Sequence, residues 1–532
     1  MKLLGLAFVV FLLGLPLLGP RFIPTHDGEY HIIRFMEFYT MLSQGYVFPR
    51  WAPTLNSGFG IPIFLFHYPF PNYVGSLFHF FGFQFVDAFK LALFSGYALA
   101  GGFCFLFLSK LWDKRSAFFG TIASLTVPYW FVDIYVRGSV GEVWALAWMF
   151  ASLAAIVWKK RIFVSISVTL LILSHNVQAL LFLPTIILFA WFKDRRSIWP
   201  IVLGVVLSAY FWIPAIVERS FVVGLSTVSP LDHFASVWEL LVPSWGSEFS
   251  GKSIIANKMS FQIGIIPLVW LILAGWRYVA LAAIIVFFML PVSYILWTTV
   301  PGMIYIQYPW RLLSFFIPIV GVSAVYVAQR ISNKTALVLS ILSIVLVYSY
   351  ARPVLYERRD DAYYQSRGNF TDGTSSMGNA FSTIWTPWKS QKAESLVEVS
   401  EGTASIIVDE QRLLFTKITV DAQTPIKMKI NRLYFPGWEV YDNGKSIVTD
   451  HETDGLIHVL LVSGKHDVVV RFEETSVRRI GDAVSISGLL WLLGWAILER
   501  IYAYRHKHIS YDERTQSARY RALHKRTHKR AR

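Results

Sequence analysis

Long apolar stretches recur along this chain of 532 residues and constrain its fold more than any other feature. A helix needs about 20 mostly apolar residues to cross the hydrocarbon core of a bilayer, which is about 30 Å thick. Stretches of this kind occupy residues 2–20, 86–109, 116–134, 139–158, 198–219, 278–298, 311–329, 335–351 and 483–503. Because 55% of the residues are apolar and only 16% are charged, the composition excludes a soluble globular protein.

Shorter apolar stretches complete the set of expected spans. Residues 162–192 form one block interrupted at Ser174-His175-Asn176, which predicts a hairpin of two short helices. A further span near 261–276 brings the total to about 12. Residues 61–85 are also apolar, but we interpret them as an aromatic segment at the outer interface, because a span there would move Lys110 to the outside.

The distribution of Lys and Arg between the spans predicts the orientation. Basic clusters at 110–115, 159–161, 193–196 and 330–334 all fall inside when the N-terminus is inside. Residues 504–532 hold ten Lys or Arg and two acidic residues, which predicts a cytoplasmic tail at the membrane surface. The first apolar stretch is interpreted as an anchoring helix, because no small-residue cleavage site precedes Arg21.

Four regions follow from these patterns. Residues 1–351 form a multi-span membrane domain whose first outer loop, 21–85, carries catalytic-type residues. Residues 352–480 form an outer domain that is β-rich from about residue 400. Residues 481–503 form the last transmembrane helix, and residues 504–532 form the tail. Alternating apolar residues predict strands at 413–420, 426–433, 438–441, 457–461 and 466–472. The sequence therefore predicts a polytopic α-helical membrane protein of about 12 transmembrane helices, with an extracytoplasmic β-sandwich-like domain before the last helix. Residues 357–380 are expected to form a loop over the membrane face.

Polar residues collect at the outer turns of the predicted bundle. Ionisable groups are costly at membrane depth, and those found there usually serve a function. The candidates are His26, Asp27, Glu29, His31 and Arg50 in the first outer loop, and Arg137, Glu142, His175, Asn176, Gln307 and Arg311 at later outer turns. Their shared side predicts a single site on the outer face.

Asp27 and His31 lie four residues apart, at the start of a helix expected over 28–45. On one helix face their Cβ atoms would be roughly 6 Å apart, which suits a base with its orienting partner or two ligands of a divalent metal. The alternative is structural: Asp27 would cap the helix, and His31 would pack at the interface.

Arg137 and Arg311 are expected at outer helix ends, where a planar guanidinium can hold a phosphate with two hydrogen bonds. Each arginine could instead extend to lipid headgroups, and His175 alone would be a buried, hydrogen-bonded histidine. Their common placement with Asn176 and Gln307 favours a phosphate-binding role.

Several motifs resemble those of a known membrane family. The segment from Thr25 to Arg34, then Pro49-Arg50-Trp51 and Gly58 to Pro62, resembles the opening of the bacterial and archaeal family labelled 6-pyruvoyl-tetrahydropterin-synthase-related. Its later motifs are similar to Arg137-Gly138 with Glu142, Ser174-His175-Asn176, and Gln307 to Arg311. The end, from Tyr434 to Arg479, is similar to the outer domain of bacterial membrane proteins proposed to glycosylate cell-surface polymers. The histidine spacing of the soluble zinc-binding pterin synthases is absent, so pterin synthesis is not expected.

The architecture also resembles that of C-type glycosyltransferases, and this resemblance implies a reaction. The donor would be a polyprenyl-phosphate-linked sugar and the acceptor a glycan, a lipid or a protein, at the cytoplasmic membrane of a prokaryote. Asp27 would act as base or metal ligand, with His26 and His31 beside it; Arg137, Arg311 and His175 would bind the donor phosphate. Supporting roles fall to Glu29, Arg50, Glu142, Asn176 and Gln307. The resemblance implies a divalent cation as the one cofactor to consider, membrane lipid as a partner, and no nucleic acid.

Two other functions stay open. A transporter or flippase of a lipid-linked glycan would place polar sites at the midplane and often shows repeated halves, and the sequence shows neither feature. A non-catalytic scaffold for envelope assembly would tolerate replacement of Asp27.

Overall fold

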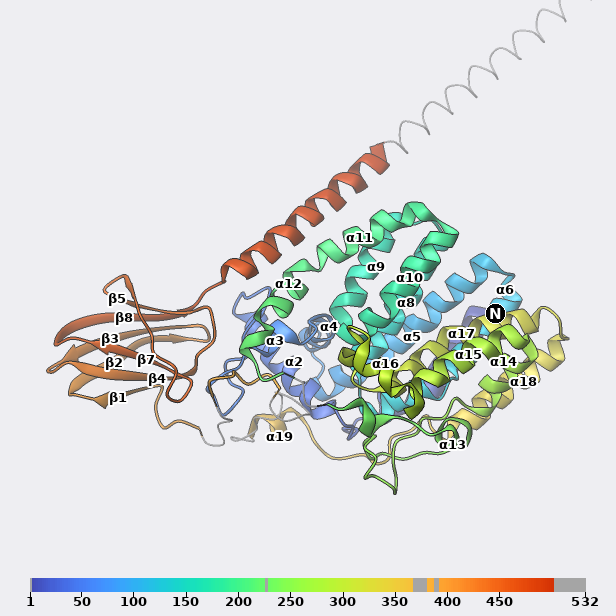
Figure 1. Ribbon diagram of the computed structural model, residues 1–532, viewed down its shortest axis with the longest axis horizontal. Coiled ribbons are helices and arrows are strands. Elements are labelled where there is room, and N and C mark those ends of the chain that lie inside the picture. The colour runs from blue at the N-terminus through green and yellow to red at the C-terminus, as the bar shows by residue number, and fades with distance from the viewer. Residues whose placement is uncertain (1, 225–227, 367–379, 387–391, 502–532) are drawn as a thin grey trace, which may run out of the picture.

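The computed structural model describes residues 2–224, 228–366, 380–386 and 392–501. The predicted basic tail at 504–532, and residues 367–379 of the predicted loop at 357–380, lie outside the described residues. A helical bundle and a smaller β domain make up the molecule, with a long helix leading away from the β domain along the bundle (Figure 1).

The bundle consists of apolar helices that cover most of the first 350 residues. Its helices are α1 (Lys2–Gly14), α5 (Phe85–Leu111), α6 (Lys114–Leu125), α7 (Tyr129–Phe131), α8 (Val140–Val157), α9 (Arg161–Ser174), α10 (Asn176–Lys193), α11 (Ile198–Leu207), α12 (Ala209–Val217), α13 (Val237–Leu241), α14 (Ile265–Ala274), α15 (Trp276–Met289), α16 (Tyr294–Thr299), α17 (Phe316–Ala328) and α18 (Asn333–Tyr348). Short 3-10 or π turns join them: η1 (Leu15–Leu18), η2 (Val132–Arg137), η3 (Arg195–Ser197), η4 (Glu218–Phe221), η5 (Pro230–His233), η6 (Pro291–Ser293), η7 (Met303–Ile306) and η8 (Pro309–Phe315).

Several of these helices are long and apolar enough to cross a membrane. Within the described ranges five single helices meet that condition, and three pairs bent by 49°, 62° and 73° raise the number to eight if each pair is one span. Four shorter apolar helices, Lys2–Leu18, Arg161–Ser174, Ile265–Ala274 and Asn333–Tyr348, coincide with further predicted spans. A protein with many membrane-length helices is thus confirmed, and the total of about 12 stays a prediction.

Small residues allow the bundle helices to approach closely. A Cβ on Gly120 of α6 would lie 2.6 Å from the backbone oxygen of Gly321 of α17. The predicted hairpin breaks at His175, whose φ of −164° and ψ of 119° are extended. The amino terminus and α6 lie away from the β domain (Figure 1).

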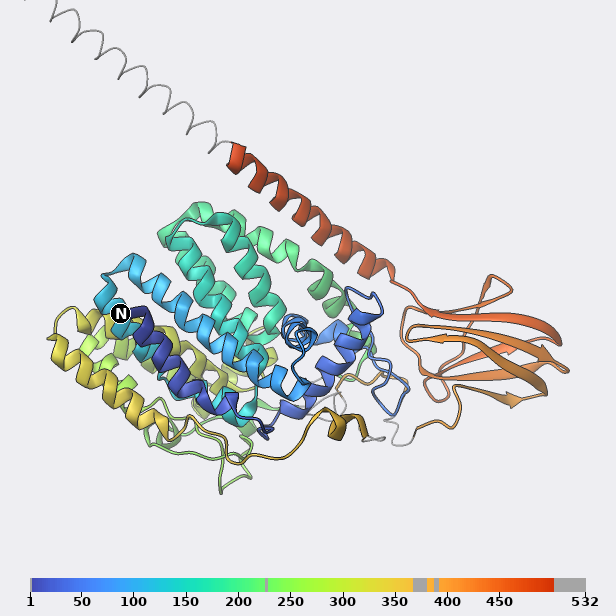
Figure 2. The ribbon, with the colours of Figure 1, turned by 180° about the vertical axis from the view of Figure 1, so that it is seen from behind.

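Residues 21–85 lie between the bundle and the β domain, as the view from behind also shows (Figure 2). They form α2 (Gly28–Ser43), α3 (Ile63–Phe66) and α4 (Phe70–Phe80). The 11 residues of α4 rise only about 16 Å, too little to cross a bilayer. The short helix α19 (Asp361–Ser366) follows the last helix of the bundle.

The β domain contains two antiparallel sheets with strand orders β1-β4-β7 and β2-β3-β8-β5-β6. The strands are β1 (Val397–Glu401), β2 (Ala404–Arg412), β3 (Phe415–Ala422), β4 (Ile426–Leu433), β5 (Trp438–Asp442), β6 (Lys445–Ile447), β7 (Leu456–Leu461) and β8 (Gly464–Phe472). Alternate residues of both sheets, including Ile418, Met428 and Val470, are completely buried in one core. Asn443 (φ 49°) and Gly444 (φ 80°) form the tight turn between β5 and β6, where both residues need a left-handed backbone.

Two buried arginines form charge pairs that attach the start of the last helix, just after the β domain, to the first loop and to η4 of the bundle. The last helix, Ser476–Ile501, starts just after β8. Arg50 contacts Glu474 at 3.3 Å and Asp482 at 2.7 Å. Arg478, which has no exposed side-chain surface, pairs with Glu218 at 3.0 Å. These contacts fix the first loop, the β domain and the last helix to one another.

Candidate functional site

A buried carboxylate, Glu142, lies at the centre of a polar network at the β-domain end of the bundle. Its side chain is fully enclosed and accepts hydrogen bonds from Tyr129 at 2.9 Å and Gln178 at 2.8 Å. Arg137 Nη2 and Arg311 Nε contact the same carboxylate oxygen at 2.9 and 3.0 Å. Three stretches of the chain, at residues 129–142, 178 and 311, therefore meet at one side chain.

The local backbone explains how Glu142 and Arg137 reach each other. Residues Val132–Arg137 form a π-helical turn, a feature frequent at functional sites. Within the turn, Arg137 Nη1 lies 2.5 Å from Asp133 Oδ1. Glu142 is in the first turn of α8, where the exposed backbone N–H groups favour a negative charge.

Arg311 is held from a second segment of the bundle. Its Nη1 donates to the backbone oxygen of Ile306 and to Gln307 Oε1, both at 2.9 Å. Gln307 has a φ of +66°, a strained conformation for a residue other than glycine, which this hydrogen bond helps to maintain. The ring of Trp310 lies 4.7 Å from the guanidinium carbon of Arg137. Both arginines are thus fixed in position.

Asp27 joins this network through its backbone. The N–H of Asp27 donates to the oxygen of Arg137 at 2.9 Å, and the N–H of His26 donates to Val136 at 3.0 Å. This close approach requires Gly138 (φ +67°), because a Cβ there would lie 2.2 Å from Oγ1 of Thr25. Asp27 is the N-cap residue of α2, but its side chain makes no capping hydrogen bond. The purely structural cap considered from the sequence is therefore not formed.

The two histidines beside Asp27 have different surroundings. His26 Nε2 lies 2.7 Å from the backbone oxygen of Ser247, and burial lowers the pKa of its ring. His31 is buried on α2, its ring 5.7 Å from that of His67 and stacked 6.2 Å from that of Phe89. Burial holds the pKa of His31 well below its usual range, so the ring is neutral at pH 7.

A bound metal ion would need several of these side chains to converge on one point. Among the described residues, no group of three or more His, Cys, Asp or Glu side chains gathers as a metal ion would require. No hydrogen bond joins the side chains of Asp27 and His31 in this part of the chain, and Nδ1 of His31 is buried without a partner. The described residues therefore do not gather into a metal centre around Asp27 and His31.

His175 and Tyr68 complete the wall of the site. His175 Nε2 is 3.7 Å from Glu142, and its Nδ1 accepts the N–H of Gln178 at 3.2 Å. The ring of Tyr68 lies 4.8 Å from that of His175. Burial raises the pKa of the Tyr68 hydroxyl, on which the charges of Asp27 and Arg34 act in opposite directions.

Three predicted supporting residues lie outside the network. Glu29 pairs with Arg359, in the segment that leads to the β domain. Arg50 belongs to the attachment of the β domain described above. Asn176 donates to the backbone oxygen of Phe66 at 3.2 Å. The other predicted residues, His26, Asp27, Arg137, Glu142, His175, Gln307 and Arg311, lie together, with His31 on the adjoining turn of α2.

Three members of the network, Tyr129, Gln178 and Tyr308, were given no role from the sequence, whereas Asp133 was expected beside Arg137 and Glu142 at the second outer turn. Asp133 lies four residues before Arg137, and Gln178 three residues after His175. Both spacings place the pair on one helix face, which was the available signal. The ring of Tyr308 stacks 5.1 Å from that of Trp310. Tyr308 and Asp27 are close enough to interact electrostatically, but no spacing rule connects them in the sequence.

Comparisons with known proteins add a likeness in outline only. No family model and no curated protein matches this chain, so the resemblance to the 6-pyruvoyl-tetrahydropterin-synthase-related family stays a prediction. One similar solved structure is the crystal structure of ArnT from Cupriavidus metallidurans bound to undecaprenyl phosphate. The alignment has 17% identity and a TM-score of 0.36, and it covers 65% of this chain and 62% of the ArnT chain. The chain therefore matches less than two thirds of that protein, and the site has to be interpreted from its own geometry.

Proposed function

We propose that this protein is a membrane glycosyltransferase that moves a sugar from a polyprenyl-phosphate-linked donor to an acceptor on the extracytoplasmic face. One observation carries the proposal. The backbone hydrogen bond from Asp27 to Arg137, at 2.9 Å, brings a carboxylate next to two arginines that Glu142 fixes at the end of an apolar bundle. A lipid-linked phosphate would arrive at this depth with its chain in the membrane.

The charges of the site suit departure of a phosphate. Three guanidinium groups (Arg34, Arg137, Arg311) and three carboxyl groups (Asp27, Asp133, Glu142) interact within it, so basic and acidic groups are equal in number. A donor phosphodiester becomes a phosphomonoester when the sugar leaves and so gains one negative charge. If Asp27 takes a proton in the same step, the net charge of the site rises by one and balances the negative charge that the phosphate gains.

The step balances as a single displacement. The acceptor hydroxyl oxygen forms a bond to the anomeric carbon of the sugar, the bond from that carbon to the phosphate oxygen breaks, and the hydroxyl proton moves to Asp27. Arg137 and Arg311 would stabilise the leaving phosphate, and one displacement inverts the anomeric centre. His26, held by Ser247, would keep the entry to Asp27 in place.

The proposed mechanism contains no step through a metal, because no group of side chains among the described residues fits one. The need for a divalent cation stays a prediction that chelation can test. The transporter and scaffold alternatives remain outcomes of the experiment below.

The experiment is transfer of radiolabelled sugar from a panel of polyprenyl-phosphate donors in membranes that contain the native chain or Asp27→Asn. We expect transfer by the native chain and a loss of about 100-fold or more in the variant at equal expression. The matched control is Asp232→Asn, which neutralises an exposed aspartate outside the network. No transfer by the native chain from any donor, or full transfer by Asp27→Asn, would contradict the proposal.

A further inference from the structure

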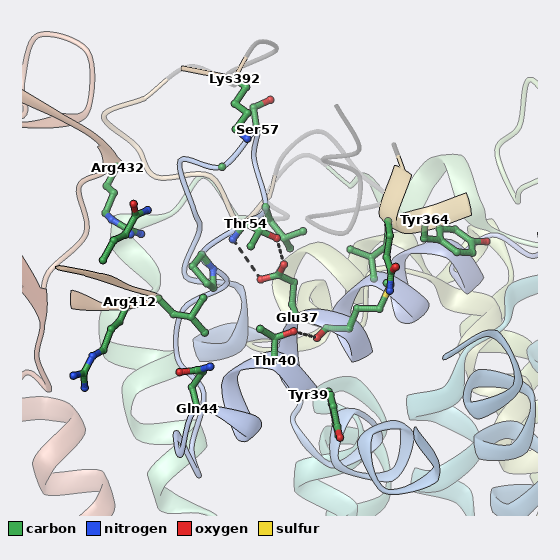
Figure 3. A pocket seen from close by; sticks show the side chains of 18 of the residues that line it. Glu37, Tyr39, Thr40, Gln44, Thr54, Ser57, Tyr364, Lys392, Arg412 and Arg432 are labelled. Carbon is green, nitrogen blue, oxygen red and sulfur yellow. Dashed lines mark hydrogen bonds between the residues drawn. The ribbon is translucent and has the colours of Figure 1, made fainter. Parts of the chain in front are cut away.

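A second feature lies on the other side of α2, where an open cleft of about 990 Å³ separates this helix from the β domain. Its volume is at the upper end of the range for ligand sites, roughly 300 to 1,000 Å³. One wall comes from α2 with the loop at 53–58, and the other from β2, β4 and α19. Figure 3 shows Glu37 entering from the first wall and Arg432 from the second.

Arg432 is a buried cation without a charged partner among the residues that the structure describes. Only 4% of the residue is exposed, yet its Nε has no hydrogen-bond partner, and no described carboxylate lies within ion-pair distance of its guanidinium. The ring of Trp438 lies 5.2 Å from the guanidinium carbon, and burial lowers the pKa of Arg432 to about 10. A buried charge is normally paired, so its partner is expected to come from outside the described residues, as a bound anion would.

The backbone of β4 explains why Arg432 reaches the cleft. The register of β4 against β7 shifts between Ile430 and Leu433, so Asn431 and Arg432 form a bulge. Asn431 is held by Ser395 and Glu398, at 2.8 and 2.6 Å. Bulges redirect side chains. Before the bulge, every second residue of β4 is buried in the core, whereas Arg432 is directed into the cleft.

Other charges of the cleft do not neutralise Arg432. Arg412 is 67% exposed and pairs with Glu410, and in Figure 3 it points away from Glu37. Lys392 is exposed at the rim, above Gly58. Glu37 accepts hydrogen bonds from Thr54. Burial raises the pKa of Glu37 to about 7, so its repulsion of an anion is weakened near neutral pH.

The remaining lining combines groups that can contact a carbohydrate. Amide and hydroxyl side chains that can hydrogen-bond sugar hydroxyls line the cleft together with aromatic rings and with apolar side chains such as Met36 and Leu413: Thr40, Gln44, Gln365 and Gln411 with Tyr39 and Tyr364. Glu37 is ten residues from Asp27, about 15 Å along the helix axis. A glycan of a few sugars could therefore reach from the cleft toward Asp27.

We propose that this cleft binds the acceptor, and that the acceptor is an anionic carbohydrate whose carboxylate or phosphate pairs with Arg432. The assignment of the acceptor rests on the proposed glycosyltransferase function. Binding of an anionic glycan to the cleft does not depend on that function, because this binding needs neither a donor nor Asp27.

The test is binding to the full-length protein in nanodiscs made of neutral lipid, with trigalacturonate and glucose 6-phosphate as anionic probes and maltotriose as the neutral one. We expect an anionic probe to bind more tightly than maltotriose, and Arg432→Gln to weaken its binding about tenfold or more. Arg471→Gln is the matched control, because this arginine of the same domain is exposed and pairs with Glu473 outside the cleft.

The outcomes separate this inference from the proposed function. Equal binding of anionic and neutral probes, or unchanged binding by Arg432→Gln, would overturn the inference. Loss of probe binding when phosphatidylglycerol is added to the nanodiscs would also overturn it, since the cleft would then hold a lipid headgroup. Unchanged probe binding by Asp27→Asn is expected whether or not that variant transfers sugar. In the transfer assay, Arg432→Gln should raise the KM for the acceptor and leave kcat nearly unchanged.

Discussion

Buried charged groups on the two sides of α2 differ in whether they have ion-pair partners. On the side of Asp27, Arg137 and Arg311 are both paired with the enclosed carboxylate of Glu142, and Asp133 pairs with Arg137. On the side of the cleft, Arg432 and Glu37 are equally buried, but neither has an ion-pair partner among the described residues. In the paired network, Arg137 and Arg311 already have a carboxylate partner before any ligand arrives. Unpaired buried groups destabilise the free protein, and a ligand of opposite charge can offset that cost.

The largest effect is expected from breaking the paired side. Glu142→Ala would leave two arginines buried with one remaining carboxylate, so it should lower the free energy of unfolding by about 3–5 kcal/mol. Thermal unfolding in nanodiscs, followed by tryptophan fluorescence, measures the change. Glu239→Ala is the control, because that carboxylate is 32% exposed, pairs with Lys258, and should cost less than about 1 kcal/mol. Equal losses in the two variants would show that Glu142 is not a centre of stability.

Glu37 should make the unpaired side sensitive to pH. Its folded pKa of about 7 lies above the ordinary value of 4.5, so the folded state holds a proton that the unfolded chain has released between these pH values. Stability should therefore fall as pH rises from about 4.5 to 7, by up to about 3 kcal/mol, and stay level above that.

The pH dependence can be isolated by subtraction. Glu37→Gln keeps a hydrogen-bonding side chain next to Thr54 and removes the titration. The difference in unfolding temperature between native chain and variant should grow across this pH range, in favour of the variant at pH 8. A difference that is constant with pH would mean that Glu37 does not titrate there.

Patterns that are local in sequence predicted the fold well. The break at His175 was visible because polar residues interrupt one apolar block, and β3, β4, β5, β7 and β8 coincide with predicted strands. The strands β1, β2 and β6 were not predicted. β1 and β2 each lie at the edge of a sheet and contain no buried residue, so they lack the alternation of a half-buried strand.

Contacts between distant segments limited the prediction of the site. Glu29 and Arg50 look like members of the site in sequence, but partners more than 300 residues away hold them at the attachment of the β domain. The clustering of Asp27, Arg137 and Arg311 was predictable because topology places all three at one end of the bundle. That Glu142 would pair with both arginines, and that a bulge would redirect Arg432, depended on backbone details that no spacing in the sequence reveals.

Arg432 and Arg478 offer a direct contrast between an unpaired and a paired buried arginine. Arg432→Met should raise the unfolding free energy by about 1–2 kcal/mol, because it removes an uncompensated charge and retains the length of the side chain. Arg478→Met should lower it by about 3 kcal/mol or more, because Glu218 would lose its partner. Thermal unfolding without ligand tests both, and a loss of stability in Arg432→Met would show that its charge is satisfied within the protein.

The smallest expected effect concerns the rim of the cleft. Lys392 is exposed, so its charge acts on a bound anion through water and is worth at most about 1 kcal/mol, or about fivefold in Kd. Lys392→Gln should therefore weaken trigalacturonate binding two- to fivefold at low salt, by this same estimate, and by less at 0.5 M salt, where the Debye length is only about 4 Å. The loss caused by Arg432→Gln should persist at high salt, because a buried contact is screened less. If salt removes both losses to the same degree, the anion is held at the rim by diffuse attraction, and the distinction between a paired and an unpaired side of α2 does not extend to binding.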